Sequence, residues 1–178
     1  MKNVFLQDKN HNTFTWESLG DIKEGRGSLG EEMPVFVYRM MHFAMRDSLT
    51  MELGREKAEY FIREAGFIAG TEFARNVLDL YLGFDDFVAD LQKTLGALKL
   101  GILRMESISD DAGEIVLTVE EDLDCSGLPI TGEAVCNYDE GFLGGIFQVY
   151  SGKPYKVREI DCWGKGDRIC RFKCTTEK

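Results

Sequence analysis

The sequence predicts an α+β fold in which a helical amino-terminal half packs on an antiparallel sheet. Apolar residues recur with helical spacing over most of the first hundred residues, and after Leu100 the apolar period changes to two. The alternating part forms two strand pairs, each interrupted by a turn, with a short helical segment between them. Because the helices come before the hairpins and do not alternate with single strands, the pattern favours α+β over a parallel α/β sheet.

The first predicted helix runs from about residue 34 to 49. Ser28 to Glu31 is typical of a capping box before it, and Pro34 would fall in the first turn, where its missing N–H costs little. Its apolar residues cover more than one stripe, so the helix is expected either to be buried on several sides or to face a partner chain. Its methionines and phenylalanines make this surface adaptable, which suits an irregular core better than a pocket.

Two further helices are predicted at residues 54–82 and 85–99. In the first of them, Gly66 and Gly70 are spaced by four residues, which places them on one face and lets another backbone come close. Glycine inside a helix costs about 1 kcal/mol relative to alanine, so two of them indicate a packing role. The second helix carries its apolar residues on one side, namely Phe87, Val88, Leu91 and Leu95.

The remaining elements are predicted from the period of two. Residues 101–107 and 114–121 form one hairpin, a short helix covers 139–150, and strands at 155–162 and 168–175 flank the turn WGKGD. The chain of 178 residues suits a single domain, residues 1–178, that is large enough to bury a core without disulfides or metal.

Composition limits the classes of partner. The net charge of -10, from 21 basic and 31 acidic residues, would repel a phosphate backbone, so nucleic acid is not expected as a direct partner. The sequence has no export-type start and no run of eighteen apolar residues, which predicts a cytoplasmic protein without a membrane span. Five cysteines, an odd number, then favour reduced thiols over a disulfide framework.

The charge is uneven along the chain. Residues 151–178 hold eight Lys or Arg and four Asp or Glu. This basic end is interpreted either as a solvated face in contact with the protein's own acidic body or as counter-charge for a metal site.

Catalytic motifs are weak. GRGSLG at residues 25–30 has the spacing of a dinucleotide-binding turn, but the preceding GDIKE is too polar for the buried strand that such a turn requires. His11 and His42 have no Ser or Cys at a telling position, so no pair of nucleophile and base is predicted. With no nicotinamide or flavin site in view, a binding protein is favoured over an enzyme.

Strand geometry separates the cysteines near the carboxyl end. Cys170 and Cys174 lie four residues apart on one strand, about 13 Å at 3.3 Å per residue, so they cannot share one metal. Cys162 and Cys170 flank a tight turn and can face each other across a hairpin. Such a pair could share a metal with two further ligands from Cys125, Cys136 or nearby acids, although a chance pair of core cysteines fits the spacing equally well.

The segments CNYDEGFLGGIFQVYSG and YKVREIDCWGKGDRICRF resemble the 4-vinyl reductase domain family. This family is related to zinc-containing aromatic-sensor domains of bacterial activators and, distantly in fold, to a subunit of a vesicle-tethering complex. The resemblance implies a closed, structural zinc site on Cys136, Glu159, Cys162 and Cys170. Because Glu159 and Cys162 would point to opposite faces of an ideal strand, a bulge or the start of the turn has to realign one of them.

The resemblance also implies a ligand pocket between the sheet and the helices. The function expected is that of a zinc-containing domain of regulatory or carrier type that binds a small apolar, hydrocarbon or aromatic ligand, forms a homodimer through the first helix and signals to a separate partner. One alternative is an accessory protein or reductase acting on a vinyl tetrapyrrole, and another is a protein-interaction scaffold. The pocket residues implied are Leu103, Met105, Ile115, Leu117, Phe142, Ile146, Val149 and Val157.

Overall fold

The structure is a computed structural model that describes residues 14–109 and 113–176. Contacts divide the chain into two units, Met1–Glu31 and Glu32–Lys178, which are described separately. In the described part of the first unit, a 3-10 turn (η2, Trp16–Leu19) precedes the short helix α1 (Ile22–Gly25). The Asp21 side chain caps α1 by accepting the backbone N–H of Glu24 at 2.9 Å.

In the described ranges, the second unit contains four α-helices, four strands and one 3-10 turn. In chain order they are α2 (Val35–Leu53), α3 (Arg55–Val77), α4 (Phe84–Ala97), β1 (Ile102–Ser109), β2 (Glu114–Glu120), α5 (Asn137–Ser151), β3 (Tyr155–Asp161), η3 (Trp163–Lys165) and β4 (Cys170–Thr176). The predicted α+β class is confirmed. The predicted capping box at Ser28 to Glu31 is wrong, because the extended Pro34 is the N-cap of α2 and a proline disfavours helical conformation in the residue before it.

The four strands form one antiparallel sheet in the order β1-β2-β4-β3. The carboxy-terminal hairpin is therefore inserted beside β2, and β1 and β3 are the edges. The register of β3 against β4 shifts between Glu159 and Asp161. A bulge at this position is one of the two ways in which Glu159 and Cys162 were expected to be brought to the same side.

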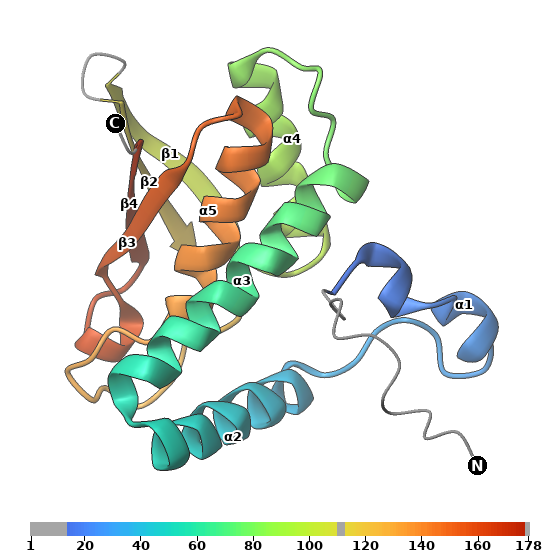
Figure 1. Cartoon of the computed structure of the whole chain (residues 1–178), viewed down its shortest axis with the longest axis vertical. Helices are drawn as coiled ribbons and strands as arrows, with labels where there is room; N and C mark the ends of the chain where they lie inside the picture. Colours follow the sequence, from blue (N-terminus) through green and yellow to red (C-terminus); the bar gives the residue numbers. More distant parts are fainter. Residues whose placement is uncertain (1–13, 110–112, 177–178) are drawn as a thin grey trace, which may run out of the picture. The chain divides into compact units, whose positions relative to one another are not determined.

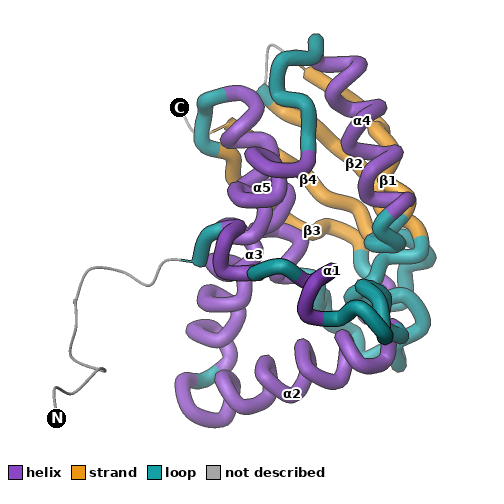
Figure 2. Tube along the Cα trace, turned by 90° about the vertical axis from the view of Figure 1, so that its right-hand side faces the viewer, coloured by secondary structure: helices purple, strands orange, loops and turns teal. Residues whose placement is uncertain are grey.

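The helices cover one face of the sheet (Figures 1 and 2). α5 contacts β3 and α4 contacts β1, while α3 packs on α5. The largest fully buried apolar side chains lie between these layers and include Phe87, Leu91, Leu117, Ile146 and Phe172. The predicted apolar side of α4 is confirmed, since Phe87, Val88, Leu91 and Leu95 are all buried.

α3 and α5 approach each other through glycines on both helices. A Cβ added at Gly66 would overlap the carbonyl oxygen of Tyr138, and one added at Gly141 would overlap the carbonyl oxygen of Arg63. Gly70 and Gly145 are equally close to the opposite backbone. The packing role predicted for the glycine pair of α3 is confirmed, and α5 carries a matching pair with the same spacing of four residues.

α2 differs from α3, α4 and α5 because none of its residues is buried among the described residues. Its exposed apolar side chains include Phe36, Met40, Met45 and Met51, of which Met51 is 86% exposed. Of the two expectations for this helix, burial on several sides is not found among the described residues, and contact with a partner chain stays a prediction. The helix has an apolar surface wider than its contact with α3 can cover.

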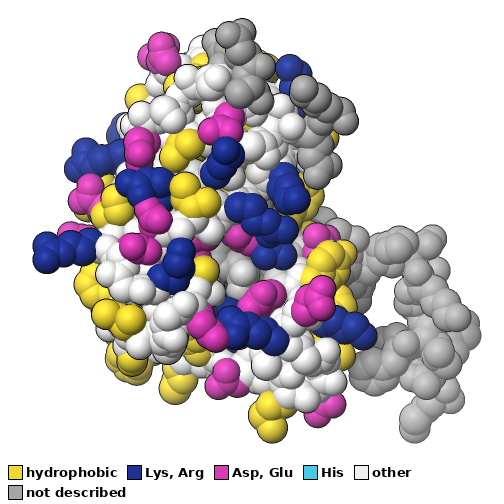
Figure 3. Space-filling view, turned by 90° about the vertical axis from the view of Figure 1, so that its left-hand side faces the viewer, with side chains coloured by type: hydrophobic (Ala, Val, Ile, Leu, Met, Phe, Trp, Pro, Cys, Tyr) yellow, Lys and Arg dark blue, Asp and Glu magenta, His cyan; other side chains and the backbone are white. Residues whose placement is uncertain are grey.

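The outer face of the sheet is covered by charged side chains of both signs (Figure 3). Arg171 pairs with Glu106 at 2.7 Å and also contacts Asp161, while Lys173 pairs with Glu114 at 2.6 Å. These residues of the basic end thus contact the protein's own acids, which fits the first of its two interpretations. Among the helices in the described ranges, none is long and apolar enough to cross a membrane.

Candidate functional site

Four cysteine sulfurs converge at one end of the sheet. The Sγ atoms of Cys125, Cys136, Cys162 and Cys170 all lie within 4.8 Å of one another, and all four residues are buried. Cys136 Sγ lies 3.9 Å from both Cys162 Sγ and Cys170 Sγ, and Cys125 Sγ lies 3.0 Å from Cys170 Sγ. None of these cysteines is in a disulfide. We call this group the cysteine cluster.

Each sulfur comes from a different local structure. Cys125 follows β2 in a turn held by Asp122, whose Oδ1 accepts the backbone N–H groups of Asp124 at 2.8 Å and Cys125 at 3.1 Å. Cys136 is the N-cap of α5, and Cys162 is the N-cap of the η3 turn. Cys170 is the first residue of β4. The cluster therefore joins the carboxy-terminal hairpin to two points of the segment between β2 and α5, one at Cys125 and one at Cys136.

The cysteine cluster could hold a metal ion. Zinc–sulfur bonds of about 2.3 Å place the sulfurs of a tetrahedral site about 3.8 Å apart, close to the two distances of 3.9 Å around Cys136, whereas the distance of 3.0 Å between Cys125 Sγ and Cys170 Sγ would have to lengthen. Neighbouring thiols stabilise the thiolate of Cys162 by hydrogen bonding, with Cys125 the largest contributor, and lower its pKa. Four thiolates are a common donor set for structural zinc and leave no open position for a substrate.

The structure brings together three of the four ligands that the resemblance implied and adds Cys125. Glu159 lies beside the cluster, where its Oε2 accepts the backbone N–H of Cys136 at 3.1 Å. Burial raises the pKa of Glu159 to about 8, with a contribution from the Cys162 side chain. Glu159 thus fixes the Cys136 loop in this structure. Cys174 is buried on β4 and is not one of the four converging cysteines.

Cys125 is the residue of the cysteine cluster that was not in the predicted ligand set. Strand spacing left it as one of several candidates for the third and fourth ligands, and the family resemblance then favoured Glu159. Its segment, EDLDCSGLP, has neither helical nor strand periodicity. The sequence indicated Cys125 as a ligand only because it is the one cysteine that precedes Cys136.

Two arginines of α2 hold the loops that carry Cys125 and Cys136. Arg39 donates to the carbonyl oxygens of Leu123 at 2.7 Å and Ser126 at 2.9 Å, on either side of Cys125. Arg46 donates to the carbonyl oxygen of Val135 at 2.6 Å and to Asn137 Oδ1 at 2.9 Å, on either side of Cys136. The helix α2 is therefore tied directly to the two loops that carry Cys125 and Cys136.

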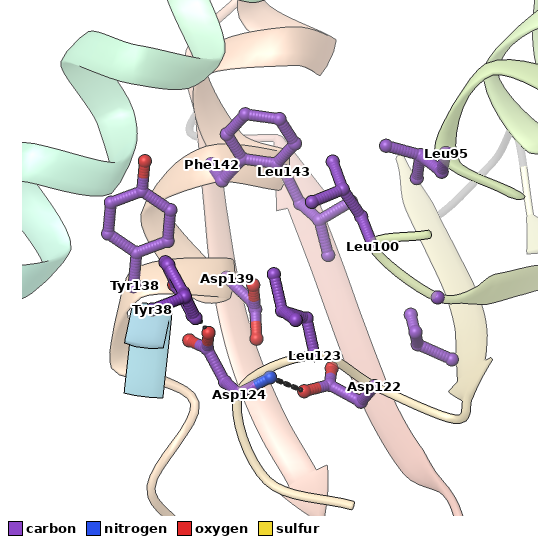
Figure 4. A pocket seen from close by; sticks show the side chains of 12 residues that line it. Tyr38, Leu95, Leu100, Asp122, Leu123, Asp124, Tyr138, Asp139, Phe142 and Leu143 are labelled. Atoms are coloured by element: carbon purple, nitrogen blue, oxygen red, sulfur yellow. Dashed lines mark hydrogen bonds between the residues drawn. The ribbon is translucent and has the colours of Figure 1, made fainter. Parts of the chain in front are cut away.

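A cavity of about 140 Å³ adjoins the cysteine cluster (Figure 4). One part of its wall is apolar and the other holds three carboxyl groups, those of Asp122, Asp124 and Asp139. Asp122, Asp139 and Cys136 have ligand atoms within 4.8 Å of one another, so the acidic wall borders the cluster. The cavity is lined by Tyr38, Leu95, Leu100, Gly101, Val119, Asp122, Leu123, Asp124, Tyr138, Asp139, Phe142 and Leu143.

The three carboxyl groups of the acidic wall, those of Asp122, Asp124 and Asp139, lie close together in a buried place, which disfavours their charged forms. Burial and the neighbouring Asp124 raise the pKa of Asp122. Burial, followed by the charges of Asp122 and Asp124, raises the pKa of Asp139. Tyr38 donates its hydroxyl to Asp124 Oδ1 at 2.6 Å, and burial together with Asp124 raises the tyrosine pKa.

The eight residues that the resemblance implied as pocket lining do not line one common pocket. Phe142 lines the cavity beside the cluster, and Met105 and Val157 line two separate surface hollows. The others are in or against the hydrophobic core, namely Leu103, Ile115, Leu117, Ile146 and Val149. Tyr38, Asp124 and Asp139 were not predicted, because they converge from α2, a loop and α5 without a shared sequence motif.

The carboxy-terminal part of the chain matches a known family. Residues 115–176 match the model of the V4R domain, which covers β2, α5, β3 and β4 and all four residues of the cysteine cluster. Two uncharacterized proteins of Methanocaldococcus jannaschii are 24% identical over 82% of this chain and 77% of their own, and 28% identical over 81% and 78%. The resemblance to the 4-vinyl reductase domain family is confirmed.

Solved structures with a similar fold extend the comparison over most of the chain. A vinyl-4-reductase family protein from M. jannaschii gives a TM-score of 0.60 at 14% identity, covering 94% of this chain and all of that one. The phenol-responsive sensory domain of the transcription activator PoxR, solved with phenol, gives 0.57 at 20% identity, covering 83% and 76%. A trafficking protein particle complex subunit 3 from Naegleria fowleri, covalently bound to palmitic acid, gives 0.59 at 12% identity, covering 80% and 97%.

Proposed function

We propose that this protein is a small-molecule-binding domain of regulatory or carrier type, in which a structural zinc on the cysteine cluster holds the wall of the ligand cavity. The observation that carries the proposal is the cavity itself, which shares the loop from Asp122 to Cys125 with the cluster. The fold similarity to a phenol-responsive sensory domain and to a palmitate-bound subunit is consistent with ligand binding in this architecture.

Size and composition narrow the ligand. An apolar cavity of about 150 Å³ is large enough to bind benzene, so about 140 Å³ suits one ring or a short aliphatic chain. Leu95, Leu143 and Phe142 supply an apolar surface that favours such a group. A ligand bound there contacts the side of the loop that carries Cys125, so binding would bias the position of α2 through Arg39.

Filling the cavity is expected to abolish binding. Leu123 is half-buried and lines the cavity, so Leu123→Trp would occupy the space that a ring needs. We expect native mass spectrometry of the purified protein and thermal shift with a panel of small aromatic and aliphatic compounds to detect binding in the parent and not in this variant. Leu98→Trp is the matched control, since Leu98 is 51% exposed and does not line the cavity. Equal binding to both variants would contradict the proposed cavity.

We further propose that the protein is a homodimer through α2, because most apolar side chains of this helix stay exposed in the described part of the chain. The double variant Phe36→Glu with Met40→Glu should convert the dimer into a monomer, since it would bury two charges per chain in the contact. Light scattering after size-exclusion chromatography measures the molar mass and so distinguishes the dimer from the monomer. Tyr81→Glu is the control at a fully exposed aromatic residue outside α2. A dimer that persists in the double variant would exclude this interface.

A further inference from the structure

The acidic wall of the cavity holds hydrogen-bond acceptors that no group among residues 14–109 and 113–176 satisfies. Asp124 is only 3% exposed, and although its Oδ1 accepts the Tyr38 hydroxyl, its Oδ2 has no hydrogen-bond partner. Asp139 Oδ2 is also buried and without a partner. Figure 4 shows both carboxyl groups on the same side of the cavity, reached from different elements. Buried polar atoms are almost always paired, so these two oxygens call for a donor from outside the chain.

The basic side chain that pairs with this wall among the described residues, His42, does not line the cavity. No Lys, Arg or His lines the cavity in the described ranges. The nearest basic group recorded for Asp124 is His42 Nε2, which lies 4.0 Å from Asp124 Oδ2 and has no hydrogen-bond partner itself. That separation is too long for a hydrogen bond. Asp122 uses its Oδ1 for the turn at Cys125 and adds a third carboxyl group to the same wall.

The opposite wall of the cavity is apolar. Leu95, Leu100, Val119, Phe142 and Leu143 are apolar and offer no polar side-chain atom to a ligand. A molecule that satisfies both walls needs a cationic donor at one end and a compact apolar group at the other. A carboxylate or phosphate ligand would be repelled by the three carboxyl groups.

We propose that the cavity binds a small primary amine, with the ammonium group between Asp124 and Asp139 and the apolar group against Phe142 and Leu143. This inference rests on the proposed function, because it names the ligand class of the same cavity. An ammonium group carries three donors and one positive charge, so it can satisfy both free oxygens and offset the mutual repulsion of the carboxyl groups. A neutral alcohol has one donor and no charge, so it satisfies at most one of them.

The test compares ligands that differ only at the polar end. Isothermal titration of the full chain, loaded with zinc, is carried out with benzylamine, benzyl alcohol, toluene and benzoate. We expect benzylamine to bind at least about 10-fold more tightly than benzyl alcohol or toluene, because its hydrogen bonds are charge-assisted, and benzoate not to bind. Asp124→Asn and Asp139→Asn should each remove most of that preference while toluene affinity stays unchanged. Asp86→Asn, at an exposed residue of α4, is the control for loss of one negative charge.

The outcomes separate this inference from the proposed function. Toluene binding as tight as benzylamine binding, in the parent protein, would overturn the amine and leave the apolar cavity in place. Binding of none of the four compounds, together with no effect of Leu123→Trp on any ligand of the panel, would remove the proposed function itself. A second metal ion per chain that competes with benzylamine would assign the carboxyl groups to a cation site and overturn the amine. Zinc content and circular dichroism of both Asn variants verify that they are folded.

Discussion

Replacing any one of Cys125, Cys136, Cys162 or Cys170 by serine is expected to remove the bound metal. Purified parent protein should carry one zinc ion per chain, because the four sulfurs converge in a buried site of suitable size. Loss of one thiolate leaves three ligands and opens the site to water and to exchange. Inductively coupled plasma and native mass spectrometry measure the stoichiometry in each variant.

The same substitutions should lower thermal stability. A ligand present at about 1,000 times its Kd stabilises the folded state by about 4 kcal/mol, and for a chain of this size each kcal/mol shifts the Tm by about 2–4 °C. Each of the four variants is therefore expected to melt roughly 8–16 °C below the zinc-loaded parent. Chelation of the parent should produce a similar decrease.

Two control variants decide which residues are the ligands. Cys174→Ser should keep its zinc, since Cys174 is not among the converging cysteines. Glu159→Gln should keep its zinc as well, because Glu159 accepts the N–H of Cys136 and four sulfurs are already available. Full zinc retention in Cys125→Ser with loss in Glu159→Gln would instead establish the set of three cysteines and one glutamate.

The second large effect is expected where α3 meets α5. Gly66→Ala or Gly141→Ala would place a methyl group onto a backbone carbonyl oxygen of the opposite helix, and neither backbone can move without displacing its helix. Overpacking of this kind costs about 1–3 kcal/mol and exceeds the gain of up to about 1 kcal/mol in helix propensity. We expect chemical denaturation to show a net loss of about 1–2 kcal/mol in the free energy of unfolding for either variant.

Gly96 provides the matched control. It lies inside α4, and a Cβ added there meets no atom within 4 Å. Gly96→Ala should therefore raise the free energy of unfolding by up to about 1 kcal/mol through helix propensity alone. If Gly66→Ala were as stable as Gly96→Ala, the close contact between α3 and α5 would not exist in solution.

The local elements could be predicted from the sequence because each has its own period. The apolar side of α4 and the alternation of β1 and β2 appear as patterns within single segments. The spacing of Gly66 and Gly70 already indicated a close helix contact. These features depend on neighbours a few residues away, which a linear sequence records directly.

The site could be predicted only in part. Cys162 and Cys170 could be paired because a hairpin brings them together, and the family resemblance added Cys136. Cys125 joins them through a turn that Asp122 holds, and the cavity combines Tyr38, Asp124 and Asp139 from three separate elements. No periodicity links such residues, since their proximity depends on how loops are held by distant groups such as Arg39.

The sequence by itself determined the fold class, most element positions, the contact glycines of α3 and the pairing of Cys162 with Cys170, to which the family resemblance added Cys136. Tertiary structure decided that the fourth sulfur belongs to Cys125, that Glu159 hydrogen-bonds the Cys136 loop and that α2 leaves its apolar face exposed. The physical reason is the range of the interactions. Helices and strands follow from local spacing, whereas a metal site and a cavity require side chains that only long-range packing brings within a few ångströms of one another.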